Sequence, residues 1–340
     1  LQATIGKGYT GGKNVDLSAI EASDFFGRSL SLNAAGDRLV VGANGDDGSG
    51  NSTSGAGAVY LFSFTDSDFS SGALQATIGK GYTGGKNIDV STLEEEDNIG
   101  RSLSLNAAGD RLAVGFGRDD GSDNGTSGAG AAYLFSFTDS NFSGGALQAI
   151  IGKGYTGGKN VDLSALEADD TFGRSVSLNA AGDRLAVASQ WDEGFDNGTA
   201  QAGAVYLFSF TDSDFSGGAL QATIGKGYTG SKNVDVSAIE ANDWFGRWVS
   251  LNAVGDRLAV GAYGDDGSGN SETGVGAVYL FSFTDSDFSG GALQATIGDG
   301  YTGGKNIHIP QLRRHDNFGM AVSLNAVGDR LAVGIQKDDG

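Results

Sequence analysis

The string LQATIGKGYTGGKN occupies residues 1–14 and returns with few changes every 73 residues. The later copies of the string begin at Leu74, Leu147, Leu220 and Leu293. The 340 residues therefore divide into four complete copies and a partial fifth: 1–73, 74–146, 147–219, 220–292 and 293–340. A repeat of this length is typical of propellers, solenoids and arrays, in which each unit packs on its neighbours.

Each copy contains short stretches of strand character separated by clusters of Gly, Asn, Asp and Ser, which are typical of turns. In the first copy the predicted strands are Leu1–Ile5, Gly27–Asn33, Asp37–Ala43 and Gly57–Phe64. The only helical candidate is Leu17–Ala22, which is long enough for one or two turns. Four strands per unit predict an all-β fold, a β-propeller of four-stranded blades built from 73-residue tandem repeats.

The strand count predicts that the chain does not close into a regular five-bladed ring. The third strand of the fifth copy is missing, and paired strands must lie about 4.8 Å apart. We therefore expect a single repeat domain, residues 1–340, that is part of a larger propeller. The alternative is self-association, in which a strand from another molecule fills the gap.

The acidic composition disfavours nucleic acids and anionic membranes as partners. Lys and Arg number 22 against 42 Asp and Glu, giving a net charge of −20. Such an excess of acid repels nucleic acids and anionic lipid surfaces. The chain has no cysteine, and no apolar run is long enough to span a membrane as a helix. We expect an extracellular or cell-surface protein.

Two repeated motifs have structural interpretations. The segment GKGYTG at residues 6–11 matches a phosphate-binding glycine pattern, but it recurs in the copies and no helix follows it, so we expect a structural turn. The repeated Asp37-Arg38 pair is expected to close a hairpin and begin the next strand. The histidines, His308 and His315, lie in the divergent fifth copy, and we expect no enzyme.

The acidic loop of each copy carries oxygen ligands suitable for calcium, the one cofactor that the sequence suggests. The candidate ligands are Asp46, Asp47, Asn51, Asp119, Asp120, Asp123, Asp192, Asp196, Asp265 and Asp266. None of these loops has the spacing of a standard calcium-binding loop. The alternative is that the acids are hydrogen-bonded turn residues.

The aromatic residues divide into two groups. Tyr60, Phe62, Phe64 and Phe26 recur in most copies and are expected to pack between blades. The aromatic side chains that do not recur are candidates for stacking on a sugar or a protein partner: Trp191, Trp244, Trp248 and Tyr263. The alternative is that these side chains are exposed at the surface and have no binding role.

The order Phe26-Gly27, Gly36-Asp37, Gly42-Ala43 and then Gly57–Phe62 resembles the FG-GAP repeat. The resemblance covers every copy, although the second has Ile99-Gly100 at the first position. It implies a propeller, commonly seven-bladed, as in the heads of integrin alpha subunits, bacterial surface repeat proteins and some lectins. The calcium loop of that family does not carry over, because only Ala34–Asp37 stands in its place.

The favoured function is a non-enzymatic extracellular adhesion or structural binding module, with a surface protein or glycan as partner. The alternative is a carbohydrate-binding lectin with sites between or on the blades. A lectin of repeated blades is expected to repeat its sugar-contacting aromatic residues, whereas the tryptophans here are solitary.

Overall fold

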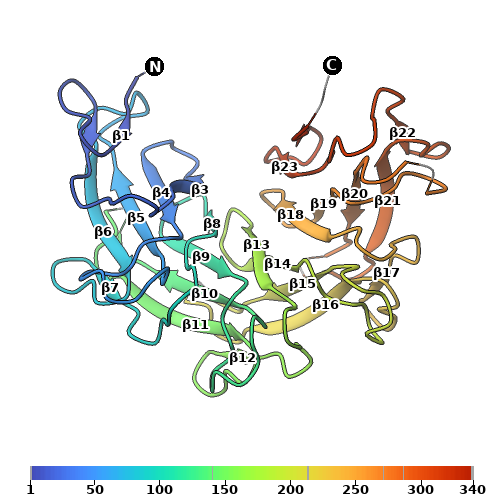
Figure 1. Cartoon of the computed structure of the whole chain (residues 1–340), viewed down its shortest axis with the longest axis horizontal. Helices are drawn as coiled ribbons and strands as arrows, with labels where there is room; N and C mark the ends of the chain where they lie inside the picture. Colours follow the sequence, from blue (N-terminus) through green and yellow to red (C-terminus); the bar gives the residue numbers. More distant parts are fainter. Residues whose placement is uncertain (1, 140, 213, 271, 286, 338–340) are drawn as a thin grey trace.

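The protein is a succession of β-sheets arranged around an arc (Figure 1). The computed structural model describes residues 2–139, 141–212, 214–270, 272–285 and 287–337. Within these residues the regular secondary structure consists of strands, and no helix occurs. Accordingly, no helix that could cross a membrane is found in the described part of the chain.

Each copy contributes strands of five kinds. The strands nearest the inside of the arc are β3 (Phe26–Leu32), β8 (Ser102–Leu105), β13 (Phe172–Leu178), β18 (Phe245–Leu251) and β23 (Ala321–Leu324). The second strands are β4 (Arg38–Ala43), β9 (Arg111–Phe116), β14 (Arg184–Ser189), β19 (Arg257–Ala262) and β24 (Leu331–Gly334). The third strands are β5 (Ala58–Ser63), β10 (Ala131–Ser136), β15 (Ala204–Ser209) and β20 (Ala277–Ser282).

The last two kinds lie at the start of each copy. The outer strands are β1 (Ile5–Gly6), β6 (Ala73–Gly79), β11 (Ala146–Gly152), β16 (Ala219–Gly225) and β21 (Ala292–Gly298). The short fifth strands are β2 (Val15–Asp16), β7 (Ile88–Asp89), β12 (Val161–Asp162), β17 (Val234–Asp235) and β22 (Ile307–His308). They complete five-stranded sheets such as β3-β4-β5-β6-β7, so each such sheet takes three strands from one copy and two from the next.

This arrangement confirms the predicted all-β repeat and three of the four predicted strands of the first copy to within about two residues at each end. The fifth strand was not predicted. It pairs in parallel with the outer strand, as in Ile78↔Ile88, over two residues. Asp89 then accepts a hydrogen bond from the amide of Gly81 at 2.7 Å, so its carboxylate holds the glycine-rich segment as the structural turn that was expected.

Two predictions for the first copy are wrong. The predicted strand Leu1–Ile5 is reduced to β1, which pairs with β2. Leu1 itself lies outside the described residues, and no described third strand pairs with β1 as β5 pairs with β6. The helix predicted at Leu17–Ala22 is a turn, closed by one hydrogen bond from the Ile20 amide to the Leu17 carbonyl.

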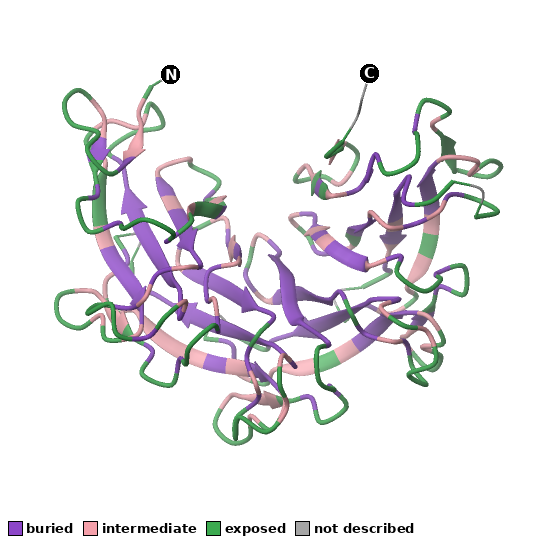
Figure 2. Cartoon of the chain, viewed as in Figure 1, coloured by how far each residue is buried: buried purple, intermediate pink, exposed green. Residues whose placement is uncertain are grey.

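The apolar core lies mainly between successive sheets, as the predicted inter-blade packing requires. Tyr60 and Phe62 are buried, and the ring of Phe26 meets that of Tyr60 edge-on within the same sheet, at 5.6 Å between centroids. Tyr133, the counterpart of Tyr60 in the second copy, shares a core cluster with Val59 of the preceding sheet. One core cluster combines residues of the third and fourth copies, from Ala186 to Phe288. The second and third strands of the first four copies are accordingly largely buried, while many loops at the ends of the strands are exposed (Figure 2).

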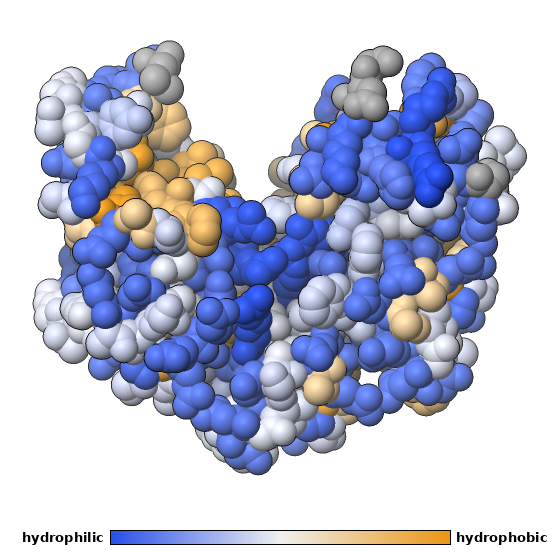
Figure 3. Space-filling view, in the orientation of Figure 1, coloured by the Kyte–Doolittle hydropathy of each residue, from blue (hydrophilic) through white to orange (hydrophobic). Residues whose placement is uncertain are grey.

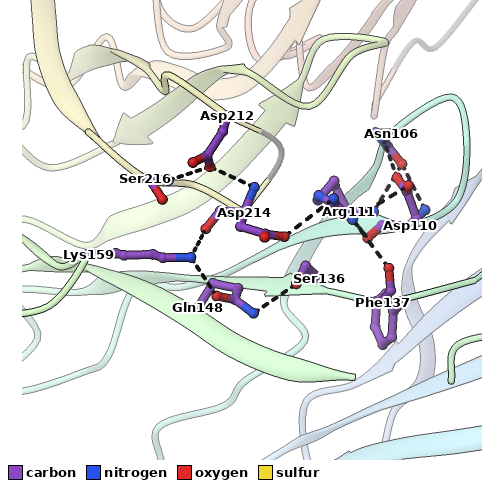
Figure 4. A network of polar contacts seen from close by, with 10 residues as sticks. All are labelled: Asn106, Asp110, Arg111, Ser136, Phe137, Gln148, Lys159, Asp212, Asp214 and Ser216. Carbon is purple, nitrogen blue, oxygen red and sulfur yellow. Dashed lines mark hydrogen bonds and ion pairs between the residues drawn. The ribbon is translucent and has the colours of Figure 1, made fainter. Parts of the chain in front are cut away.

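The repeated Asp-Arg pair belongs to a polar network that joins neighbouring sheets (Figure 4). The Asn106 side chain, more than the aspartate, accepts the turn amides, including that of Asp110 at 3.0 Å. Arg111 donates to the Asp110 carbonyl at 2.7 Å and pairs with Asp214 of the following copy at 3.5 Å. Lys159 donates to the Asp214 carbonyl at 2.7 Å, so the network has a structural role.

The arc is open between its two ends. The described residues contain no pairing that joins β24 to β1, so no closed ring of sheets is found among them. Leu30 on the first inner strand is 64% exposed, whereas its counterpart Leu103 is 8% exposed. Figure 3 shows apolar surface on the same arm of the arc. We still predict that this apolar surface is covered by further blades of a larger propeller or by a strand from another molecule.

Glycines set the distance between sheets. Gly130 has a φ of +87°, and a Cβ built there would lie 2.0 Å from the carbonyl oxygen of Phe172 in the next sheet. Gly57, Gly203 and Gly276 occupy the same position in their copies and meet the following backbone in the same way. Only a residue without a side chain permits this approach.

We predict that Gly130→Ala lowers the free energy of unfolding by about 3 kcal/mol, because it adds a clash to an unfavourable φ. Gly157→Ala is the matched control. Gly157 has a φ of +79° but open space around it, so this variant is expected to cost only about 1 kcal/mol. Urea unfolding of both variants measures the difference, and equal losses would contradict a role for sheet spacing.

Candidate functional site

The copies differ from one another mainly at one end of their sheets. One variable position precedes the inner strand and is occupied by Phe25, Asn98, Thr171, Trp244 and Asn317. Two more follow the second strand and are occupied by Asn44, Gly117, Gln190, Tyr263 and Gln336, and by Gly45, Arg118, Trp191, Gly264 and Lys337. The opposite end carries Asn-Ala-x-Gly-Asp-Arg in every copy.

Strand register brings the variable positions together. Phe245 of β18 is paired with Ala262 of β19, which places the preceding Trp244 beside the following Tyr263. At the other end of the same strands Leu251 is paired with Leu258, next to the constant turn. We call the end of the sheets that carries the variable positions the variable face.

The backbone at the variable face is strained. The residue before the inner strand has a positive φ in every copy, and none of these residues is glycine: Phe25 (54°), Asn98 (60°), Thr171 (58°), Trp244 (53°) and Asn317 (59°). This conformation is a genuine outlier for a β-branched residue such as Thr171. The preceding copy holds it in place, because the Thr171 amide donates to the Gly128 carbonyl at 3.0 Å. Strain of this kind clusters at functional sites.

A bulge at the start of the inner strand directs an arginine side chain. Phe172 pairs with Ser189 and Ser175 with Ala188, so Gly173 and Arg174 are extra residues in the strand. Bulges commonly redirect a side chain beside a functional site. The arginine recurs in four copies, as Arg28, Arg101, Arg174 and Arg247, which we call the inner arginines. The fifth copy has Met320 instead.

A pocket of about 390 Å³ opens on the variable face between the second and third copies. Its lining includes the inner arginines Arg101 and Arg174 together with Trp191. The rest of the lining is Glu95, Glu96, Asn98, Gly117, Arg118, Asp120, Ser127, Gly128, Asp169 and Thr171. Most of these residues occupy positions that change from copy to copy, so a different copy would line such a pocket with different chemistry.

The structure brings together some of the predicted ligand-binding aromatics. Trp244 stacks on Tyr263 with 4.7 Å between ring centroids and 23° between planes, and Arg247 lies 5.5 Å from the centroid of Tyr263. Trp191 lines the pocket and is 37% exposed. Trp248 is not on the variable face with them. It lies within β18 and packs against the core between the fourth and fifth copies.

The predicted calcium ligands take part in hydrogen bonds within their own copies and, for the aspartate that opens each loop, with a tyrosine of the following copy. Asp192 accepts from the hydroxyls of Tyr206 at 2.7 Å and Tyr228 at 2.9 Å, and from the Gly194 amide at 2.8 Å. Burial raises the pKa of this carboxyl. Asp46 and Asp265 have the same three kinds of partner, and Asp119 accepts from Tyr155 and Gly121.

The remaining predicted ligands lie in the same loops. Five of them accept backbone amides, namely Asp47, Asp120, Asp123, Asp196 and Asp266. Asn51 lies at a turn with a φ of 51°. Within the described part of the chain, no three His, Asp or Glu side chains form a group that could hold a metal ion. Calcium at these loops stays a prediction.

Two sets of residues at the variable face were not predicted from the sequence. The inner arginines are one, and the aspartates Asp24, Asp97, Asp170 and Asp243 just before the inner strands are the other. Burial is the main cause that raises the pKa of Asp170 to about 7, and the negative charge of nearby Asp192 contributes to this rise. The hydrogen bond from the Glu167 amide acts in the opposite direction and lowers the pKa. Asp97 and Asp243 are also raised to about 7 by burial. Their recurrence in the copies was the available signal.

The fold and the variable face define an all-β protein of repeated five-stranded sheets whose residues vary between copies at one end of the sheets. The family described as FG-GAP repeat matches residues 18–62 and 237–281. These two spans begin at the same position of the first and fourth copies. The chain thus carries FG-GAP repeats, as the resemblance implied. A comparison with curated proteins gave no match.

We predict that Asp170→Asn makes stability less dependent on pH. A carboxyl whose pKa is about 7 when folded and about 4 when unfolded binds more protons in the folded state between these values, so the free energy of unfolding falls as pH rises. Asparagine keeps an acceptor for the Glu167 amide but does not titrate. Between pH 5 and 8 the variant is expected to lose about 2 kcal/mol less than the parent chain. Equal losses would contradict the burial argument.

Calcium is tested by thermal melting with millimolar calcium and with a chelator. An ion bound only by the folded chain raises the melting temperature by mass action. The rise is expected to disappear in a variant with Asp47, Asp120 and Asp266 changed to Asn, which keeps acceptors for the backbone amides of these loops. A melting curve that neither calcium nor the chelator moves would remove the idea.

Proposed function

We propose that the chain is a non-enzymatic extracellular recognition or adhesion module of the FG-GAP propeller type, and that it binds its partner through the variable face. FG-GAP repeats are found in extracellular proteins of the adhesion type. The observation that carries the proposal is the pocket between the second and third copies, which is lined mostly by variable residues in an otherwise repeated scaffold. Variation concentrated on one face is the pattern expected of binding loops on a rigid support.

The strained backbone supports the same proposal. Five non-glycine residues at one position keep a positive φ although glycine would remove the strain. The backbone conformation is the same in each copy while the side chain changes, as expected of positions that present different side chains to a binding partner. The expected partner is a surface protein or a glycan.

A lectin is the alternative that one observation favours. The Trp191 ring forms a wall of a pocket whose other residues are polar or charged, and a sugar ring stacks its apolar face on such a wall while its hydroxyls meet polar groups. The pocket is not repeated with the same residues in other copies, so a lectin of this kind is expected to have one principal sugar site.

The test combines an array of glycans and extracellular proteins, with and without calcium, with two variants. Trp191→Gly gives the third copy the residue that Gly45 and Gly264 provide elsewhere, and we expect it to reduce partner binding at least about tenfold. Val254→Ala is the control at the constant end, where Val254 is 66% exposed and three copies carry alanine. Equal binding by both variants would contradict recognition by the variable face.

A further inference from the structure

The inner arginines lie close together across neighbouring copies. Arg28, Arg174 and Arg247 follow the glycine of a bulge on an inner strand. Arg101 follows Gly100 directly before β8, and the inner strands of successive sheets contact one another directly. Hydrogen bonds tie these strands together, as from the Leu178 amide to the Ser104 hydroxyl at 2.8 Å. Burial, together with the positive charges of Arg28, Arg247 and Arg118, lowers the pKa of Arg101 to about 10.

These arginines have no carboxylate partner among the described residues. Arg174 and Arg247 are 8% and 9% exposed, and among the described residues the polar partner of both is the Gln190 side chain, at 3.0 and 3.3 Å. The Nε atoms of Arg101 and Arg247 are buried without a hydrogen bond. Within a chain of net charge −20, this absence of an acidic partner is unusual.

The other repeated arginine of each copy shows the contrast. Arg111 forms ion pairs with Asp110 and Asp214, and Arg38, Arg184 and Arg257 also pair with aspartates. A buried guanidinium without an anion costs stability, because desolvation is not offset by a partner charge. Four copies nevertheless keep the inner arginine, although Met320 shows that the repeat tolerates an apolar side chain there.

We propose that the inner arginines form an oxyanion site, which takes a carboxylate or sulfate group of the ligand at the variable face. The planar guanidinium presents paired donors that match the oxygens of such groups. Arg101 and Arg174 line the pocket and are the members of the set that a ligand in it would meet. The inference rests on the proposed recognition function and names the chemistry of the ligand.

The acidic residues of the pocket limit what can enter. Glu96 forms an ion pair with Arg118 at 2.6 Å, and Asp120 accepts the Gly128 amide at 2.7 Å. Glu95 and Asp169 also line the pocket. Carboxylates beside the arginines disfavour a highly charged ligand. They favour a single oxyanion group on an otherwise neutral, hydroxyl-rich molecule that also contacts Trp191, such as an acidic sugar.

The experiment titrates the whole chain with sodium glucuronate and with sodium sulfate at constant ionic strength, and uses glucose as the neutral control. Calorimetry is expected to show binding of glucuronate, and Arg101→Met is expected to weaken it about tenfold. Arg330→Met is the matched control, because it removes an equal charge at an exposed position of the fifth copy. Melting curves confirm folding, and Arg174→Met, which removes the other inner arginine of the pocket, serves as a second variant.

Each binding result assigns or excludes one ligand chemistry. Binding of glucuronate alone assigns the site to a sugar-borne carboxylate, and binding of both anions assigns it to oxyanions in general. Absence of binding to either anion, or equal affinity in the parent chain and in Arg101→Met, overturns the inference. If the array detects a partner while both anions fail, the proposed recognition function stands and only its oxyanion chemistry falls.

Discussion

The close approach of backbones between successive sheets is the constraint on which the rest of the structure depends. At Gly57, Gly130, Gly203 and Gly276 the chain meets the next sheet so tightly that a Cβ would lie 1.9 to 2.3 Å from a carbonyl oxygen. The residues that begin the next inner strand also bond to this sheet through main-chain atoms, as the Phe172 amide does to the Ala129 carbonyl at 2.9 Å. Because main-chain hydrogen bonds have a narrow range of lengths, each sheet sits on the next in the same relation, and the copies repeat in space as they do in sequence.

This spacing also explains why one end of the sheets can vary. The hydrogen bonds that hold Thr171 in its strained conformation involve main-chain atoms, so they do not depend on the side chain at that position. The opposite end has no such freedom, because the Asn106 side chain itself accepts the amides of the turn. Side-chain identity is therefore fixed where side chains carry the turn and free where the main chain carries it.

The sequence predicted what depends on strong periodic patterns. Alternation and apolar runs located the strands Phe26–Leu32, Arg38–Ala43 and Ala58–Ser63, and recurrence identified the packing of Tyr60. The two-residue strand Ile88–Asp89 was missed because so short a segment carries no period. The inner arginines were missed for a different reason. Packing of the inner strands on one another brings them together from four copies, so no single copy shows them as a cluster, although Gly-Arg recurs in each of the four.

The central claim is that a constant scaffold carries a face whose residues can be exchanged between copies. The most direct test gives the third copy two residues of the second, Thr171→Asn with Trp191→Arg, matching Asn98 and Arg118. Urea unfolding measures the result. The free energy of unfolding is expected to stay within about 1 kcal/mol of the parent value, as for surface changes that leave the main-chain contacts intact. A loss of about 3 kcal/mol or more, as for a core substitution, would contradict the claim.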